Sequence, residues 1–158
     1  MAILGMFYFF LFTMEGVFGD PRNASHRVSV KILCLAEGKL LLFKRASTQD
    51  FNLVGGGVDR GEGLLEALER EFYEETGQEL GEKMPQLLHV EIRQFPAGGQ
   101  FDAAINVFYR LGYETCFIPR LEAGVYEEYR WVSFSELKKL PISEHSNKEF
   151  LLSYGDQF

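Results

Sequence analysis

The chain is 158 residues long, the size of one average domain, and its 46% hydrophobic and 25% charged residues are typical of a globular protein rather than a disordered one. Its 23 acidic and 16 basic residues give a net charge of −7. Because nucleic-acid polymers are bound through many Lys and Arg contacts to phosphate, we expect no such partner. Cys34 and Cys116 show neither a disulfide framework nor the spacing of a zinc site, so we interpret them as free thiols and expect a cytoplasmic protein.

Residues 1–25 form an apolar N-terminal extension ahead of the expected domain. Its uncharged run, residues 2–12, is shorter than the about 20 residues that a membrane helix needs. It also lacks the basic start and the small-residue cleavage site of a signal peptide, so we expect no membrane span and no secretion. Three interpretations stay open: an extra strand packed on the core, a segment buried between the subunits of a homodimer, or sequence upstream of a start at Met14.

The body of the chain begins with an expected β-hairpin, whose strands cover residues 26–35 and 39–44 around a turn at 37–38. A short strand over 51–54 leads into residues 55–63, which read GGGVDRGEG. Five glycines in this segment predict a loop with unusual backbone freedom. The Leu-, Ala- and Glu-rich run that follows predicts a helix over 64–76, ended by a cap at Gly77.

The second half of the chain alternates apolar segments with turns. We expect strands over 86–95, 101–111 and 129–134, with an irregular stretch over 112–124. Ser135 is expected to cap a short helix that ends near Leu140, and Ser143 a final helix that stops at Gly155. No repeat or linker divides the sequence, so residues 26–158 are expected to form a single mixed α/β domain.

Three glutamates lie on one face of the helix over 64–76. At about 100° per residue, Glu71 and Glu75 lie almost above one another, and Glu74 lies beside them. Carboxylates placed so close together repel one another, unless a hard divalent cation such as Mg²⁺ or Mn²⁺, which prefers oxygen ligands, lies among them. For this helix taken alone, a solvated acidic face is the alternative interpretation.

The spacing between the glycine loop and the helix favours the metal site. Five residues separate Gly56 from Glu62, and seven more precede the run REFYEETG that starts at Arg70. This segment resembles the Nudix box, G-x5-E-x7-R-E-U-x-E-E-x-G-U, in which U is a bulky apolar residue. The last position departs from the signature, because Gln78 stands where an apolar residue is usual. Ahead of the box, Val54 stands where many members carry proline.

The resemblance implies a fold and an activity. The fold is the Nudix fold, an α/β/α sandwich around a mixed β-sheet. The activity is metal-dependent cleavage of the diphosphate linkage in a small nucleotide, a nucleoside diphosphate joined to another group, with Mg²⁺ or Mn²⁺ as cofactor. The alternative is a Nudix-fold module that binds a nucleotide or sugar nucleotide without cleaving it. Such a module is expected to have lost carboxylates from the box, whereas this chain keeps them all, so we expect an enzyme.

The resemblance also assigns roles to the residues of the box. Glu71, Glu74 and Glu75 match the metal-binding glutamates of the family. The carbonyl of Gly55 is expected to add a ligand, because only glycine lets the backbone approach a metal and phosphates this closely. Gly56 and Gly57 are expected to shape the turn that receives the substrate.

Four residues of the box are expected to take part in catalysis: Glu74, Glu75, Glu62 and Arg70. Arg70 is expected to orient one of the glutamates rather than to bind metal. Glu62 is either a member of a salt bridge or an auxiliary carboxylate. Attack of water on a diphosphate requires that the anionic charge be neutralised, which metal ions do, and that the water lose a proton, which a carboxylate of the box or of a mobile loop accepts.

Three residues outside the box are weaker candidates. Arg45 falls where Nudix proteins often place a basic residue that contacts the phosphate or the nucleotide. It is equally explained as an ordinary charge at the end of a strand. Glu127 and Glu128 are either a further metal ligand or base, or carboxylates of the surface.

Overall fold

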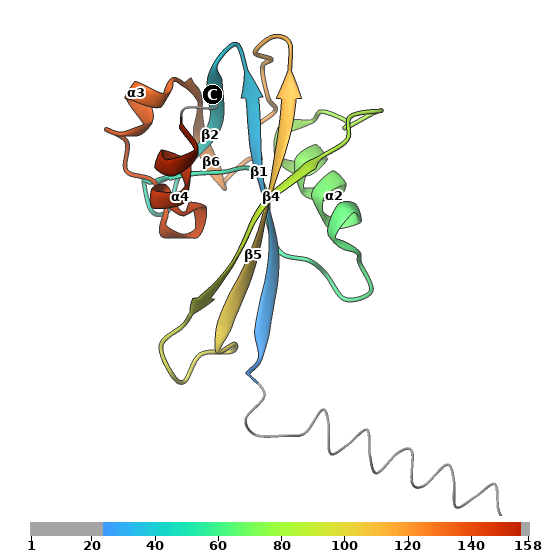
Figure 1. The fold of residues 1–158 in the computed structure, drawn as a ribbon, viewed down its shortest axis with the longest axis vertical. Helices are drawn as coiled ribbons and strands as arrows, with labels where there is room; N and C mark the ends of the chain where they lie inside the picture. The colour runs from blue at the N-terminus through green and yellow to red at the C-terminus, as the bar shows by residue number, and fades with distance from the viewer. Residues whose placement is uncertain (1–23, 156–158) are drawn as a thin grey trace, which may run out of the picture.

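The fold is a three-layer arrangement seen in a computed structural model that describes residues 24–155. The interpretations of the N-terminal extension therefore fall outside the described residues, apart from its last two positions. Figure 1 shows β1, β4 and β5 as long twisted strands, with α2 on one side and α3 and α4 on the other. The strands are β1 (His26–Ala36), β2 (Lys39–Arg45), β3 (Phe51–Asn52), β4 (Gln86–Gln94), β5 (Ala103–Tyr113) and β6 (Tyr126–Val132). The helices are α2 (Leu64–Thr76), α3 (Phe134–Leu137) and α4 (Lys148–Tyr154), with a 3₁₀ turn, η1 (Glu144–Ser146), ahead of α4.

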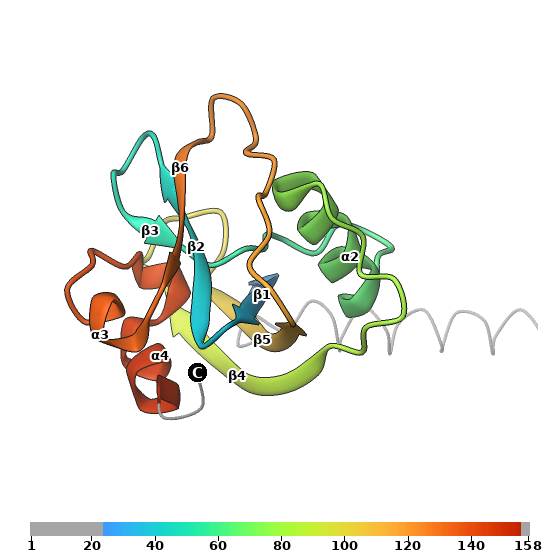
Figure 2. The ribbon, with the colours of Figure 1, turned by 90° about the horizontal axis from the view of Figure 1, so that it is seen from above.

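The described strands form one mixed sheet. Its order is β3-β2-β1-β5-β4, and β6 pairs with β2 outside this path. β1 and β5 are parallel, whereas the other pairs are antiparallel. The view in Figure 2 shows the same layers from above, with α2 and the C-terminal helices on opposite sides of the sheet. The predicted α/β sandwich around a mixed sheet is thus confirmed.

The predicted hairpin is formed by β1 and β2, in the register Leu35 opposite Leu40. Glu37 and Gly38 both adopt positive φ, 51° and 70°, as the tightest hairpin turns require. The hairpin places β2 beside the central strand and directs its end, Arg45, toward the loop that precedes β3.

The helix α2 has the predicted boundaries because its local signals agree with its packing. Gly77 ends it in the left-handed conformation, with φ 70°, and its N–H donates to the Tyr73 carbonyl at 2.8 Å. Ala67, Leu68 and Phe72 are fully buried against the sheet. Burial of a side chain the size of Phe72 contributes about 1.5–3 kcal/mol, so the apolar face holds α2 in place and leaves the acidic face toward the glycine loop.

The core has two parts because β1 buries both of its faces. Val30, Ile32 and Cys34 pack toward α2, whereas Leu33 and Leu35 pack toward α3 and α4. Cys34 is a free thiol, and its burial raises its pKa. None of the helices in the described part is long and apolar enough to cross a membrane.

The last strand begins earlier than the sequence predicts. β6 starts at Tyr126 rather than at residue 129, because its first residues pair with the end of β2, Tyr126 opposite Arg45 and Glu128 opposite Lys44, across an irregularity in the register. It ends at Val132. This pairing between distant segments gives no local signal in the sequence, and it brings Tyr126 into the centre of the molecule.

The C-terminal helices use other caps than those predicted. Ser133, not Ser135, caps α3, because the Glu136 side chain accepts a hydrogen bond from the Ser133 N–H at 2.8 Å and completes a capping box. Ser143 caps the short turn η1 rather than the last helix. Asn147 caps α4 instead, accepting a hydrogen bond from the Phe150 N–H at 2.9 Å.

Candidate active site

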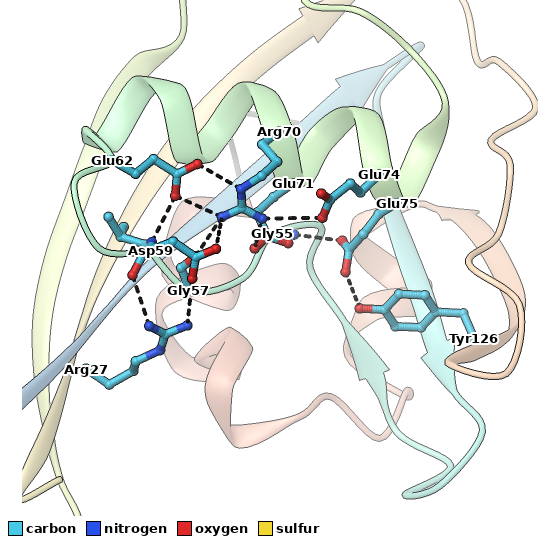
Figure 3. Close-up of polar contacts among 11 residues, drawn as sticks. Arg27, Gly55, Gly57, Asp59, Glu62, Arg70, Glu71, Glu74, Glu75 and Tyr126 are labelled. Atoms are coloured by element: carbon cyan, nitrogen blue, oxygen red, sulfur yellow. Dashed lines mark hydrogen bonds and ion pairs between the residues drawn. The ribbon is translucent and has the colours of Figure 1, made fainter. Parts of the chain in front are cut away.

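Arg70 is the centre of a polar network on the exposed side of α2 (Figure 3). Its guanidinium donates to both carboxylate oxygens of Glu62, at 2.8 and 2.9 Å. It also donates to Glu71 at 2.8 Å and lies 3.3 Å from Glu74. These charge-assisted bonds hold the pKa of Glu62 down at about 2 and raise the pKa of Arg70. Glu62 thus forms a salt bridge with Arg70, and its second predicted role, as an auxiliary carboxylate, stays a prediction.

The glycine loop is held against α2 and β1 by two arginines. Arg70 donates to the Gly57 carbonyl at 2.9 Å, and Arg27 donates to the Val58 carbonyl at the same distance. Glu62 accepts a hydrogen bond from the Asp59 N–H at 2.9 Å, which closes the turn of the loop. The loop thus has a fixed shape, although it carries little side-chain packing of its own.

Gly55 and Gly56 bring the backbone against two carboxylates. Gly55 has φ 127°, and a Cβ there would collide with the Val30 carbonyl, so only glycine fits. Its N–H donates to Glu75 Oε2 at 2.8 Å. A Cβ at Gly56 would collide with the Glu71 carboxylate, which therefore lies directly over the loop backbone. Two of the predicted metal ligands and the predicted glycines are thus brought together.

Glu75 is the most deeply placed of the three glutamates. It is 5% exposed and accepts a second hydrogen bond, from the Tyr126 hydroxyl. Burial raises the pKa of Glu75 to about 7, although both hydrogen bonds favour the carboxylate. Burial also raises the pKa of Glu71, against the opposing effect of Arg70. Tyr126 was missed by the sequence analysis, because it lies between the stretch expected to be irregular, 112–124, and the strand expected over 129–134.

The donor chemistry fits a hard divalent cation, although the side chains are not arranged as a closed cluster. In residues 24–155 no three acidic, histidine or cysteine side chains converge as a ready-built metal site. Glu71 and Glu74 instead turn toward Arg70, and the Glu74 side chain is 53% exposed. Three carboxylates against one guanidinium leave an excess of negative charge and of oxygen donors, which is the combination that Mg²⁺ and Mn²⁺ bind. To hold such an ion together, Glu71 and Glu74 would have to turn away from Arg70.

A cavity of about 640 Å³ lies between the end of β2 with the loop that follows it and the residues of η1. Arg45 lines it, and its guanidinium lies 5.4 Å from the centre of the Tyr126 ring, which links the cavity wall to Glu75. The other lining residues are mostly polar: Lys31, Ser47, Thr48, Asp50, Asn52, Ser143, Glu144 and His145. Lys31 was also missed, although a charge between the apolar residues of an expected strand was a visible signal.

Glu127 and Glu128 form ion pairs at the surface. Glu127 binds Lys44 at 2.6 Å and accepts a hydrogen bond from Gln49 at 3.1 Å. Glu128 pairs with Arg130 on the same strand. Their neighbour Tyr126, rather than either carboxylate, is the residue of β6 that contacts a glutamate of α2.

Comparison with known proteins identifies the family. The model of the NUDIX domain matches residues 25–154. The chain belongs to the Nudix family. Among solved structures, the E. coli dihydroneopterin triphosphate pyrophosphohydrolase is similar with a TM-score of 0.70 and 16% identity, over 83% of this chain and 96% of that one. A MutT NUDIX hydrolase from Burkholderia pseudomallei is 26% identical, with a TM-score of 0.68, over 81% of this chain and 96% of that one.

A third Nudix structure is a complex with a nucleotide. The NUDIX domain of Shewanella oneidensis NrtR, solved with ADP ribose, is similar with a TM-score of 0.68 and 14% identity, over 92% of this chain and 96% of that one. A comparison with curated protein sequences found no significant match. The Nudix fold and family are therefore established, and the signature identified in the sequence is confirmed as that of this family.

Proposed function

We propose that this protein is a divalent-metal-dependent Nudix hydrolase that cleaves the diphosphate linkage of a small nucleotide. The observation that carries the proposal is the contact between the glycine loop and the acidic face of α2. There Gly55 donates to Glu75, the Gly56 backbone lies against Glu71, and Arg70 fixes both loop and helix. A carboxylate-rich centre of this kind, next to a polar cavity, suits a substrate that combines an anionic diphosphate with a nucleoside.

The metal would be held by Glu71, Glu74 and Glu75, with the Gly55 carbonyl as a further ligand. When bound, Mg²⁺ or Mn²⁺ supplies neutralisation of the diphosphate charge and lowers the pKa of a bound water. Arg70 contacts both Glu71 and Glu74 and so orients the two carboxylates that would hold the metal. Tyr126 holds Glu75 in place from the opposite side.

We assign Glu74 as the base that accepts a proton from the attacking water. Its side chain is the most accessible of the three, 53% exposed against 14% for Glu71, and its contact with Arg70, at 3.3 Å, is longer than those of Glu62 and Glu71, at 2.8 Å. A carboxylate that is open to solvent and only loosely held can accept a proton from an incoming water. Glu75, by contrast, is buried and engaged at both oxygens.

Arg45 and the glycines are assigned to the substrate. Arg45 lines the cavity, so its guanidinium is available to a phosphate or a nucleobase there. Gly56 and Gly57 form the floor of the turn that meets the diphosphate. The alternative interpretation is that Arg45 is an ordinary charge at the end of a strand. A loss of substrate affinity in Arg45→Met would exclude that alternative.

The partner is expected to be a small nucleotide rather than a polymer or a membrane. The net charge of −7 opposes binding to nucleic acid. A cytoplasmic location belongs to the same proposal, and a homodimer stays a prediction, as one of the three interpretations of the N-terminal extension. Two of the similar proteins support a small partner, since one is a dihydroneopterin triphosphate pyrophosphohydrolase and the other is a domain complexed with ADP ribose.

A release assay tests the proposal. Phosphate and pyrophosphate are measured with Mg²⁺, and again with Mn²⁺, against nucleoside triphosphates, oxidised triphosphates, sugar nucleotides, ADP ribose and dinucleoside polyphosphates. We expect one preferred substrate, whose cleavage stops when EDTA is added. Tight binding of one compound without cleavage under either metal would instead support the alternative of a Nudix module that binds a nucleotide and does not hydrolyse it.

A further inference from the structure

Lys31 is a cation that lines the cavity. On β1 it lies between Val30 and Ile32, both fully buried toward α2. Because side chains alternate along a strand, Lys31 faces the other way, on the same side as Leu33 and the C-terminal helices. There it lines the cavity together with Arg45 and His145.

The positive charge of Lys31 is not used by the protein itself. Among residues 24–155, its ammonium donates no hydrogen bond and forms no ion pair. The two acidic residues of the cavity wall are already engaged, since Asp50 accepts hydrogen bonds from Thr48 and from Asn52, and Glu144 pairs with Arg93. Glu144 is offset by Arg93, so the charges of Lys31 and Arg45 face one uncompensated carboxylate, that of Asp50, and the cavity wall carries an excess of positive charge. A half-buried cation without an ion pair favours an anionic ligand there.

Lys31 also lies next to the carboxylate centre. The Lys31 Cα lies beside Gly55, since a Cβ on that glycine would be 3.2 Å from the Lys31 Cα. The Gly55 N–H in turn binds Glu75. The pKa of Lys31 is lowered, because its burial outweighs the attraction of Glu75 and Glu71. Lys31 thus stands between the cavity on one side and the predicted metal ligands on the other, where the charged part of a ligand spanning both would pass.

We propose that Lys31 binds a phosphate oxygen of the substrate's diphosphate, so that the nucleoside lies in the cavity and the diphosphate runs past Lys31 toward the glutamates of α2. This inference rests on the proposed function, and it adds to it an orientation of the substrate and a binding residue outside the Nudix box.

Three variants test the role in turnover. Lys31→Met keeps the length of the side chain and removes its charge, Lys31→Arg keeps the charge, and Lys44→Met is the matched control because Lys44 is already paired with Glu127. With the preferred nucleotide and saturating Mg²⁺, we expect Lys31→Met to raise KM about ten- to a hundred-fold with a smaller change in kcat, as for loss of one charged hydrogen bond. We expect Lys31→Arg to restore most of the affinity, and Lys44→Met to match the wild type. An unchanged KM in Lys31→Met overturns the proposal.

Binding without metal separates this inference from the proposed function. In EDTA, inorganic pyrophosphate is titrated into the same proteins by calorimetry. We expect the wild type and Lys44→Met to bind it equally and Lys31→Met to bind it at least about ten-fold more weakly. This result would hold even if the chain cleaved no nucleotide. Equal binding by wild type and Lys31→Met, or none by the wild type, contradicts the role of Lys31.

A thermal-unfolding measurement tests whether Lys31 has only a structural role. If Lys31 served only to neutralise Glu71 and Glu75, its replacement by Met would lower Tm. Because the ammonium is unpaired in the described structure and its burial opposes its charge, we expect Lys31→Met to unfold at or above the Tm of the wild type. A marked fall in Tm together with unchanged pyrophosphate binding would overturn the assignment.

Discussion

Arg70 contributes to the site by joining residues that would otherwise separate. It contacts Glu62, Glu71, Glu74 and the Gly57 carbonyl with one planar group, a geometry that lysine cannot reproduce. It thus couples the order of the glycine loop to the direction of the glutamates. The local sequence says that an arginine stands here, but not that a single side chain reaches both elements.

Replacing this residue tests its role in positioning. We expect Arg70→Lys to lower the free energy of unfolding by about 1–3 kcal/mol, because the paired bonds to Glu62 are lost, and to weaken the apparent affinity for Mg²⁺. Urea denaturation and Mg²⁺ titration of the activity provide the two measurements. Arg130→Lys, which alters a surface pair with Glu128, serves as the control and is expected to change neither. Wild-type stability in Arg70→Lys would refute this account of the network.

Glu75 makes the stability of the metal-free protein depend on pH. Its pKa is about 7 in the folded chain against an ordinary value of 4.5, so between these values folding takes up a proton. The contribution of Glu75 is therefore full below about pH 4.5, falls as pH rises to about 7, and is constant above. We expect urea unfolding in EDTA to show the wild type losing stability from pH 5 to pH 8 relative to Glu75→Gln. Parallel pH curves for the two proteins would contradict the burial of this carboxyl.

At the scale of the elements, the glycine loop is built against β1 by backbone contacts. The Val30 N–H donates to the Gly56 carbonyl and the Ile32 N–H to the Val54 carbonyl, both at 2.9 Å. This arrangement requires a residue without a side chain at Gly55, where the carbonyl of Val30 leaves no room for a Cβ. The edge of β1 therefore positions the glycine loop as much as α2 does.

A substitution at Gly55 tests whether the contact with β1, rather than the general effect of replacing a glycine, determines the stability and activity of the loop. We expect Gly55→Ala to destabilise the fold by more than about 2 kcal/mol and to abolish turnover, because strain at positive φ adds to the collision with Val30. Gly112→Ala is the control, since its Cβ would meet open space. Denaturation midpoints and the release assay measure both effects. A Gly55→Ala protein with the activity and midpoint of Gly112→Ala would show that the loop is not held as described.

The elements also differ in how far the sequence predicted them. The helix α2 was predicted with its bounds because propensity, apolar spacing and the cap at Gly77 all act locally. The start of β6 was missed because it depends on pairing with β2, more than 80 residues away along the chain, as for Lys44 opposite Glu128. The caps of α3 and α4 were misplaced because several serines and an asparagine compete there, and only packing decides between them.

At the scale of the whole molecule, the box residues could be placed on one helix and one loop from spacing alone. The neighbours that give them their chemistry could not. Tyr126 reaches Glu75 from a distant strand, and Lys31 enters the cavity only because the sheet turns that face toward the C-terminal helices. Such contacts follow from the order of the strands, which the sequence does not state directly.

The measurement that tests the central claim most directly compares wild type and Glu74→Gln in the release assay. Glu74 is exposed and makes no contact with the core, so the variant is expected to fold with an unchanged circular dichroism spectrum and Tm. With the preferred nucleotide and Mg²⁺, we expect kcat to fall by about 10²–10⁴-fold, the effect of losing a proton acceptor, and EDTA to abolish the wild-type activity. Unchanged release of phosphate or pyrophosphate by Glu74→Gln, or wild-type cleavage that persists in EDTA, would contradict the account.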